Sequence, residues 1–263
     1  MNEAEIDLGM KAEELSGKEV VAYLDRRIAD TIRETERSEI WRTLTSPDTS
    51  PQLIAAIMRE IYLEIVMYQP DSIEAAIAII GQMPRNVPPE LIEEMLHHQA
   101  EEFDHGEMAM RDFCSLGGCE EGARGRRMSP TAFNTAACWW MIAQKRDPFV
   151  YLGALYPFEG LTPIITGKIK GFLREKGMDA DALGFVEYHS TADLEHTRIV
   201  KELIEQIADD YPESRAAICY GINYFLQVYP LPGWNAAYRR ARAGIEGRSI
   251  AESVNLAVAE ATG

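Results

Sequence analysis

The chain is poor in basic residues and has no long apolar run. Its 263 residues carry 26 Lys and Arg against 42 Asp and Glu, a net charge of -16. Nucleic acid and anionic membranes both attract clustered basic side chains, so this balance argues against either partner. No apolar run approaches the ~20 residues that span a bilayer. The acidic N-terminus also lacks the basic start and apolar centre of a signal peptide. We therefore expect a cytoplasmic protein that binds neither nucleic acid nor membrane.

Cysteine is also scarce. Four cysteines in a chain of this length are too few for a disulfide framework, so we expect reduced thiols. Cys114 and Cys119 are separated by four residues, and no second pair completes a zinc site. Gly-rich nucleotide loops, Walker motifs and nucleophile elbows are absent as well, which argues against the enzyme classes that depend on them.

Helical periodicity, by contrast, extends along almost the whole chain, and no pair of segments reads as strands. We expect a helix from a capping Ser16 and further helices that stop before Pro70 and Pro84, with a kink or break at Pro157. Other predicted segments include a helix over 89–116, a loop over 117–130, a helix from Asp179 to Asp209, and a last helix over 250–261. The chain is predicted to be one all-α domain over residues 1–263, with eight or more helices.

Five histidines are present, and two of them lie in the stretch EYHSTADLEHTRIV. On one helix, steps of four and three residues would place His189, Asp193 and His196 on one face. Imidazole and carboxylate are both good ligands for a transition metal. The stretch therefore predicts a metal site.

Four further residues extend this set. Glu102 precedes His105 by three residues, so both project from one helix face. Glu64 and Glu159 stand isolated among apolar residues, and burying an ionised carboxylate costs several kcal/mol or more unless it is paired or metal-bound. The order is an acid, an acid–histidine pair, an acid and a second acid–histidine pair, as in di-iron carboxylate bundles. The predicted ligands are Glu64, Glu102, His105, Glu159, His189, Asp193 and His196.

Alternatives remain at two of these positions. Glu60 competes with Glu64 from one turn earlier, and Glu101 competes with Glu102, although only Glu102 has the i,i+3 relation to His105. The adjacent histidines, residues 97 and 98, are expected at the surface or at the edge of the core.

These residues resemble the haem-oxygenase-like di-iron oxidases and oxygenases, a family of iron-containing redox enzymes. The resemblance rests on HSTADLEH, on the isolated Glu in YPFEG, and on AEEFDHGEMAMRDFCSLGG, with REIYLEIVMYQP as the first core helix. It covers roughly residues 50–205, which would carry the metal-site core.

The resemblance implies a single-domain bundle of seven core helices, with extra helices at both ends of the chain. It implies two iron ions that cycle between Fe(II) and Fe(III), and reaction with O2 through a peroxo-di-iron(III) species. The implied activity is oxidation of a small molecule, an amino acid or a fatty acid, by N-oxygenation, desaturation or carbon–carbon cleavage in natural-product biosynthesis. It further implies a homodimer and allows an external electron donor.

For the substrate we prefer a small polar molecule, such as an amino acid, whose carboxylate would pair with Arg59, Lys168 or Arg198. Two other functions fit the same sequence. One is a ferritin-like protein that stores or carries iron, although His189 and the number of helical segments argue against a plain four-helix bundle. The other is a metal-free, thiaminase-like hydrolase of the same fold, using a cysteine and an acid.

Overall fold

The structure is a computed structural model that describes residues 11–145, 147–191 and 193–247, apart from the side chain of Asp193. These residues form helices and no strand, which confirms the all-α prediction. The α-helices are α2 (Gly17–Arg37), α3 (Glu39–Thr45), α4 (Pro51–Ile80), α5 (Pro89–Glu101), α6 (His105–Ser115), α7 (Glu120–Arg124), α8 (Pro130–Lys145), α9 (Val150–Glu175), α10 (Gly184–His189), α11 (Asp193–Asp210), α12 (Ser214–Phe225) and α13 (Leu231–Ile245). Short 3-10 helices cover Ala12–Glu14, Glu102–Asp104 and Ala180–Ala182. The last predicted helix, over 250–261, lies outside the described residues.

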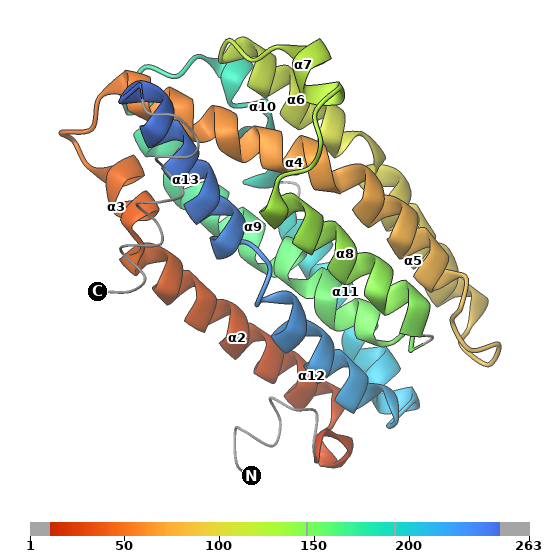
Figure 1. The fold of residues 1–263 in the computed structure, drawn as a ribbon. Helices are drawn as coiled ribbons and strands as arrows, with labels where there is room; N and C mark the ends of the chain where they lie inside the picture. The colour runs from red at the N-terminus through yellow and green to blue at the C-terminus, as the bar shows by residue number, and fades with distance from the viewer. Residues whose placement is uncertain (1–10, 146, 192, 248–263) are drawn as a thin grey trace, which may run out of the picture.

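Two long helices organise the bundle, and both run along its length in Figure 1. Helix α4 packs against α6, α8 and α13, whereas α9 packs against α2, α11 and α12. The contact between α9 and α12 requires glycine. A Cβ atom on Gly153 would lie 1.9 Å from the carbonyl oxygen of Ile218, and one on Gly221 would lie 2.2 Å from that of Val150. These two glycines let the backbones approach and so fix the position of α9.

Prolines do not interrupt the long helices as the sequence suggested. Pro70 lies inside α4, and Pro157 and Pro163 lie inside α9. The predicted stop at Pro70 and the predicted break at Pro157 are therefore wrong. A proline inside a helix loses one backbone hydrogen bond. Here each long helix is buried along much of its length, and packing stabilises it across the defect.

The sequence expected unbroken helices in two places where the structure has breaks. The 3-10 turn Glu102–Asp104 separates α5 from α6. The predicted helix from Asp179 to Asp209 is divided into a 3-10 turn, α10 and α11. His189 ends α10 and His196 lies in α11, so the two belong to different helices. The prediction that they lie on one face of a single helix is therefore wrong, yet both histidines reach the interior beside Glu102.

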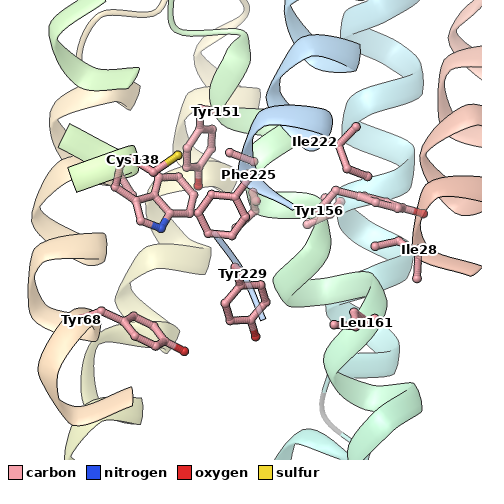
Figure 2. Close-up of a cluster of buried hydrophobic side chains, with 14 of the residues drawn as sticks. Ile28, Tyr68, Cys138, Tyr151, Tyr156, Leu161, Ile222, Phe225 and Tyr229 are labelled. Carbon is pink, nitrogen blue, oxygen red and sulfur yellow. The ribbon is translucent and has the colours of Figure 1, made fainter. Parts of the chain in front are cut away.

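The described residues share one continuous hydrophobic core. Aromatic side chains gather at its centre, where Cys138, Tyr151 and Phe225 lie near one another and Tyr229 lies farther along the bundle (Figure 2). Within the described part of the chain, no helix is both long enough and apolar enough to span a membrane.

Candidate metal centre

Four side chains from three α-helices and one 3-10 turn converge in the interior of the bundle. His98 comes from α5, Glu102 from the turn that follows it, Glu159 from the middle of α9 and His196 from α11. Nε2 of His98 lies 3.2 Å from Oε1 of Glu159, and Nδ1 of His196 lies 3.6 Å from Oε2 of Glu159. One ligand atom from each residue falls within 4.8 Å of all the others, a spacing that lets them share one ion.

A second group adjoins the first through Glu102. Oε2 of Glu102 lies 2.7 Å from Nδ1 of His105, and Nε2 of His189 lies 3.2 Å from the same Nδ1 atom. In this group, too, one ligand atom of each residue lies within 4.8 Å of the other two. Because Glu102 belongs to both groups and has two carboxylate oxygens, it can bridge two ions.

The orientation of His189 is set by its own helix. Its Nδ1 lies 2.7 Å from the backbone carbonyl of Phe185, which can only accept, so Nδ1 carries the proton and Nε2 offers a lone pair. The Phe185 ring also stacks on the imidazole, with ring centroids 3.8 Å apart. Asp112 accepts a hydrogen bond from the backbone N–H of Phe185. Burial and the neighbouring His105 lower the pKa of His189 to about 3, so it is neutral, as a metal ligand must be.

The charged side chains are concentrated in the first group, around Glu159. Burial alone would lower the pKa of His98, but the negative charges of Glu159, Glu102 and Glu101 raise it to about 9. Burial alone would raise the pKa of Glu159, but the facing His98 and His196 bring it below its usual range. The interaction with Glu159 in turn raises the pKa of His196. Without a metal, protons on the histidines balance the buried carboxylate.

Pro163 helps to hold Glu159 in place. Because Pro163 has no N–H, the carbonyl of Glu159, four residues earlier, loses its partner within the helix. The hydroxyl of Thr197 in α11 donates a hydrogen bond to this carbonyl. The defect in α9 thereby ties Glu159 to the helix that carries His196.

Buried polar atoms in this cluster fit a cation. Nε2 of His98 and Oε2 of Glu159 are buried and have no hydrogen-bond partner among the described residues. Such atoms call for an explanation, and a bound ion is one. Over the two groups, four imidazoles and two carboxylates form the mixed nitrogen and oxygen donor set that suits iron and neighbouring transition metals. The residues therefore fit the iron that the sequence resemblance implied.

The structure brings together most of the predicted ligands. Glu102, His105, Glu159, His189 and His196 all belong to the two groups. Asp193 begins α11, but its side chain lies outside the described residues. Between the two adjacent acids, Glu102 lies in both groups, whereas Glu101 lies at the edge, 3.3 Å from Nε2 of His196 and partly exposed.

Glu64 is not brought to the centre. Its Oε1 accepts a hydrogen bond from Nη2 of Arg240 at 2.6 Å, and its Oε2 accepts one from the hydroxyl of Thr131 at 2.7 Å. Its rival, Glu60, accepts a hydrogen bond from Nε of the same Arg240 at 2.7 Å. The buried charge of Glu64 is balanced by an arginine in α13, and it needs no metal.

His98 is the residue that the sequence reasoning missed. It was expected at the surface or the core edge, but it is 6% exposed and faces Glu159. Its neighbour His97 has a side chain that is 76% exposed and lies 3.4 Å from Glu101. The missed signal is spacing: His98 precedes Glu102 by four residues, which places both on one helix face.

A cavity of about 100 Å³ opens onto the centre. Four of the candidate ligands, Glu102, His105, Glu159 and His189, line one part of it. The other described residues of the lining are apolar, aromatic or uncharged polar side chains, with no Lys or Arg among them. An engineered apolar cavity of roughly 150 Å³ binds benzene, so this space suits a short apolar group.

An all-α fold and a buried cluster of histidine and carboxylate side chains are the features of a helical bundle that could hold a metal ion. Comparison with known families makes this specific. Residues 71–229, more than half of the chain, match the model of the iron-containing redox enzymes, and the chain belongs to that family. None of the curated proteins compared with the chain matches it. The family supports an oxidoreductase that contains iron.

Several solved structures resemble the chain, and two of them illustrate the likeness. A domain of unknown function with a haem-oxygenase-like fold from Shewanella denitrificans OS217 is 19% identical, with a TM-score of 0.72 over 86% of this chain and 95% of that one. A TenA homologue from Pseudomonas syringae pv. tomato DC3000 is 13% identical, with a TM-score of 0.59 over 80% of this chain and 90% of that one. At these identities the likeness concerns the fold, and it confirms the predicted haem-oxygenase-like bundle.

Proposed function

We propose that the protein is an O2-dependent oxidoreductase with a non-haem di-iron centre, and that it oxidises a small, largely apolar molecule. The observation that carries this proposal is the pair of ligand groups that share Glu102 and open onto an apolar cavity. Two ions bridged by one carboxylate need such an arrangement, and a storage protein has no use for the cavity.

Each side chain has a distinct task in this proposal. Glu102 would bridge the ions, Glu159 and His196 would complete one site, and His105 and His189 would complete the other, with Asp193 as a further predicted ligand. The iron ions supply the redox chemistry by which O2 accepts electrons from the substrate and, where required, from an external donor. The protein supplies fixed ligands and a cavity that excludes water, so that the oxidant reacts with the substrate and not with water.

The cavity favours an apolar substrate over the polar one that the sequence suggested. A buried carboxylate without a partner costs several kcal/mol, and no Lys or Arg among the described residues lines the cavity. Lys168 instead pairs with Glu36, and Arg198 pairs with Glu195 and Glu202. Arg59 is absent from the lining. Of the two implied substrate classes, the fatty acid therefore agrees better with this cavity, provided that its carboxylate stays outside the apolar part.

The test begins with the purified protein loaded with Fe(II) without oxygen. Elemental analysis should find about two irons per chain. O2 uptake is then followed by stopped flow with medium-chain fatty acids, neutral alkyl compounds and amino acids. We expect an apolar compound to accelerate O2 uptake and to yield an oxidised product. Iron content far below two per chain, or O2 uptake that no organic compound alters, would contradict the proposal.

The two rival functions make different demands on the cavity. Iron storage predicts mineral formation in a multi-subunit cage, with no organic product. A thiaminase-like hydrolase predicts a cysteine beside the substrate, but none of the four cysteines lines the cavity. Both arguments favour the oxidoreductase. The homodimer stays a prediction of the resemblance, and light scattering of the iron-loaded protein would test it.

A further inference from the structure

His98 has one ring nitrogen at the metal cluster and the other at a buried polar pair. Its Nε2 faces Glu159, as described above, and has no hydrogen-bond partner among the described residues. Its Nδ1 lies 3.0 Å from the side-chain amide of Gln99. The same terminal atom of that amide lies 3.0 Å from the hydroxyl of Tyr151. Gln99 and Tyr151 are both buried, and Tyr151 belongs to the aromatic cluster in Figure 2.

Two hydrogen-bond arrangements fit these positions, because the oxygen and nitrogen of an amide have the same shape. In the first, the NH2 group of Gln99 donates to Nδ1 of His98 and to the Tyr151 oxygen. Neutral His98 then carries its proton on Nε2, which blocks that atom as a ligand. In the second, Oε1 of Gln99 accepts from Nδ1–H of His98 and from the Tyr151 hydroxyl. Nε2 then offers a lone pair toward Glu159.

Only the second arrangement lets His98 itself bind a metal at the cluster. A ligand histidine must be deprotonated on the atom that binds, and its other N–H is normally donated to a fixed acceptor. His98, four residues before Glu102 and within 4.8 Å of the other donor atoms, meets the requirement of position. Gln99, which Tyr151 holds in place, supplies the fixed acceptor for Nδ1–H of His98.

We infer that His98 is an additional ligand of the metal centre, beyond the Glu102-x-x-His105 and His189-x3-Asp193-x2-His196 motifs. Gln99 and Tyr151 are positioning residues that keep its proton on Nδ1. The inference rests on the proposed function only in assuming a metal at this cluster. It requires neither O2 chemistry nor a particular substrate.

Titration with Co(II) under argon, followed by visible absorption, tests the inference independently of turnover. His98→Ala should weaken the binding of at least one ion by about tenfold or more, and Gln99→Leu by about 10- to 100-fold, because ligand and outer-shell losses have that size. His98→Gln repeats the first test with a side chain of similar size. His97→Ala, at the adjacent exposed position, is the matched control and should bind as the wild type does.

Gln99→Glu decides between the two arrangements. A carboxylate can only accept, so it supports the second arrangement and abolishes the first. We expect Gln99→Glu to bind Co(II) within about threefold of the wild type, in contrast to Gln99→Leu. Circular dichroism of each metal-free variant checks that the fold is kept.

The possible results separate the two proposals. Binding by His98→Ala and His98→Gln at wild-type strength would overturn the assignment of His98 alone. A Gln99→Glu variant as weak as Gln99→Leu would overturn the positioning role. A wild-type protein that binds no metal at all would overturn the proposed function and this inference with it.

Discussion

Glu64 in α4 and Arg240 in α13 form an ion pair between residues 176 positions apart, with 2.6 Å between Oε1 and Nη2. The Glu64 side chain is 4% exposed and that of Arg240 is 25% exposed. This pair balances the negative charge of the buried Glu64 without a metal. It also joins α13 to the long helix that forms one wall of the cavity.

Removing Arg240 should therefore destabilise the protein. Arg240→Met leaves Glu64 as an uncompensated buried charge, and such losses cost roughly 3–5 kcal/mol. The double variant Arg240→Met, Glu64→Leu should recover a large part of this loss. Urea denaturation followed by circular dichroism measures both. In the same series, Glu64→Gln should keep the wild-type iron content, and a large drop in iron would return Glu64 to the ligand set.

Glu102 should matter more to metal binding than any other acid, because it belongs to both ligand groups. Glu102→Ala is expected to weaken the binding of both ions, whereas His105→Ala is expected to weaken chiefly one. Elemental analysis after anaerobic Fe(II) loading and desalting distinguishes the two patterns. Equal iron loss in the two variants would argue that the groups do not act as separate sites.

The hydroxyl of Thr197 donates a hydrogen bond to the Glu159 carbonyl, and the importance of this bond should depend on Pro163. Thr197→Val leaves a buried carbonyl without this donor, at a cost of about 1–3 kcal/mol. Pro163→Ala restores an N–H that the same carbonyl can accept from within α9. Thr197→Val should therefore reduce the stability of the Pro163→Ala variant by less than it reduces the stability of the wild type. Equal costs in thermal unfolding would show that Pro163 does not set the need for Thr197.

The sequence predicted the helices and most of the cluster because both depend on local spacing. Periodicity identified the helical segments, and the i,i+3 relation linked Glu102 to His105. Ser16 also caps α2 as the local sequence indicated, and its side chain accepts a hydrogen bond from the backbone N–H of Glu19. Each of these features involves residues within one or two helical turns, where spacing determines geometry.

The sequence failed where a distant partner decides the outcome. Nothing near Glu64 signals that Arg240 will balance its charge. Pro70 and Pro157 were expected to end or break helices because local rules cannot include the packing that holds α4 and α9 together. His98 was assigned to the periphery although it shares a helix face with Glu102. The spacing was available there, but burial depends on α9 and α11, which bring Glu159 and His196 to it.

The shape of the cavity leads to a prediction at Leu44, which lines it from α3. Leu44→Phe should fill part of the space and shorten the longest alkyl compound that the protein accepts. Leu44→Ala should lengthen it, at a stability cost of roughly 2–5 kcal/mol. Stabilisation of the protein by a series of neutral alkyl compounds, read as a shift in Tm, measures both changes. The same length preference in the two variants would show that α3 does not bound the substrate site.

The cysteines provide a test of the hydrolase alternative. Cys119 is exposed and Cys114 is partly exposed, whereas Cys138 and Cys219 are buried. Burial raises the pKa of Cys138 to about 12, so at pH 8 its thiolate, the reactive form, is almost absent. In the unfolded chain, cysteine has a pKa of about 8.5, and the sulfur is accessible.

We therefore expect Cys119 to react first with a thiol-specific reagent in the native protein, Cys114 more slowly, and Cys138 and Cys219 only after unfolding in urea. Mass spectrometry of the labelled peptides identifies each site. Cys119→Ser should abolish the fast phase and leave iron content and O2 uptake unchanged. A native protein in which Cys138 reacts rapidly at pH 8 would contradict its burial, and it would make that thiol a candidate nucleophile.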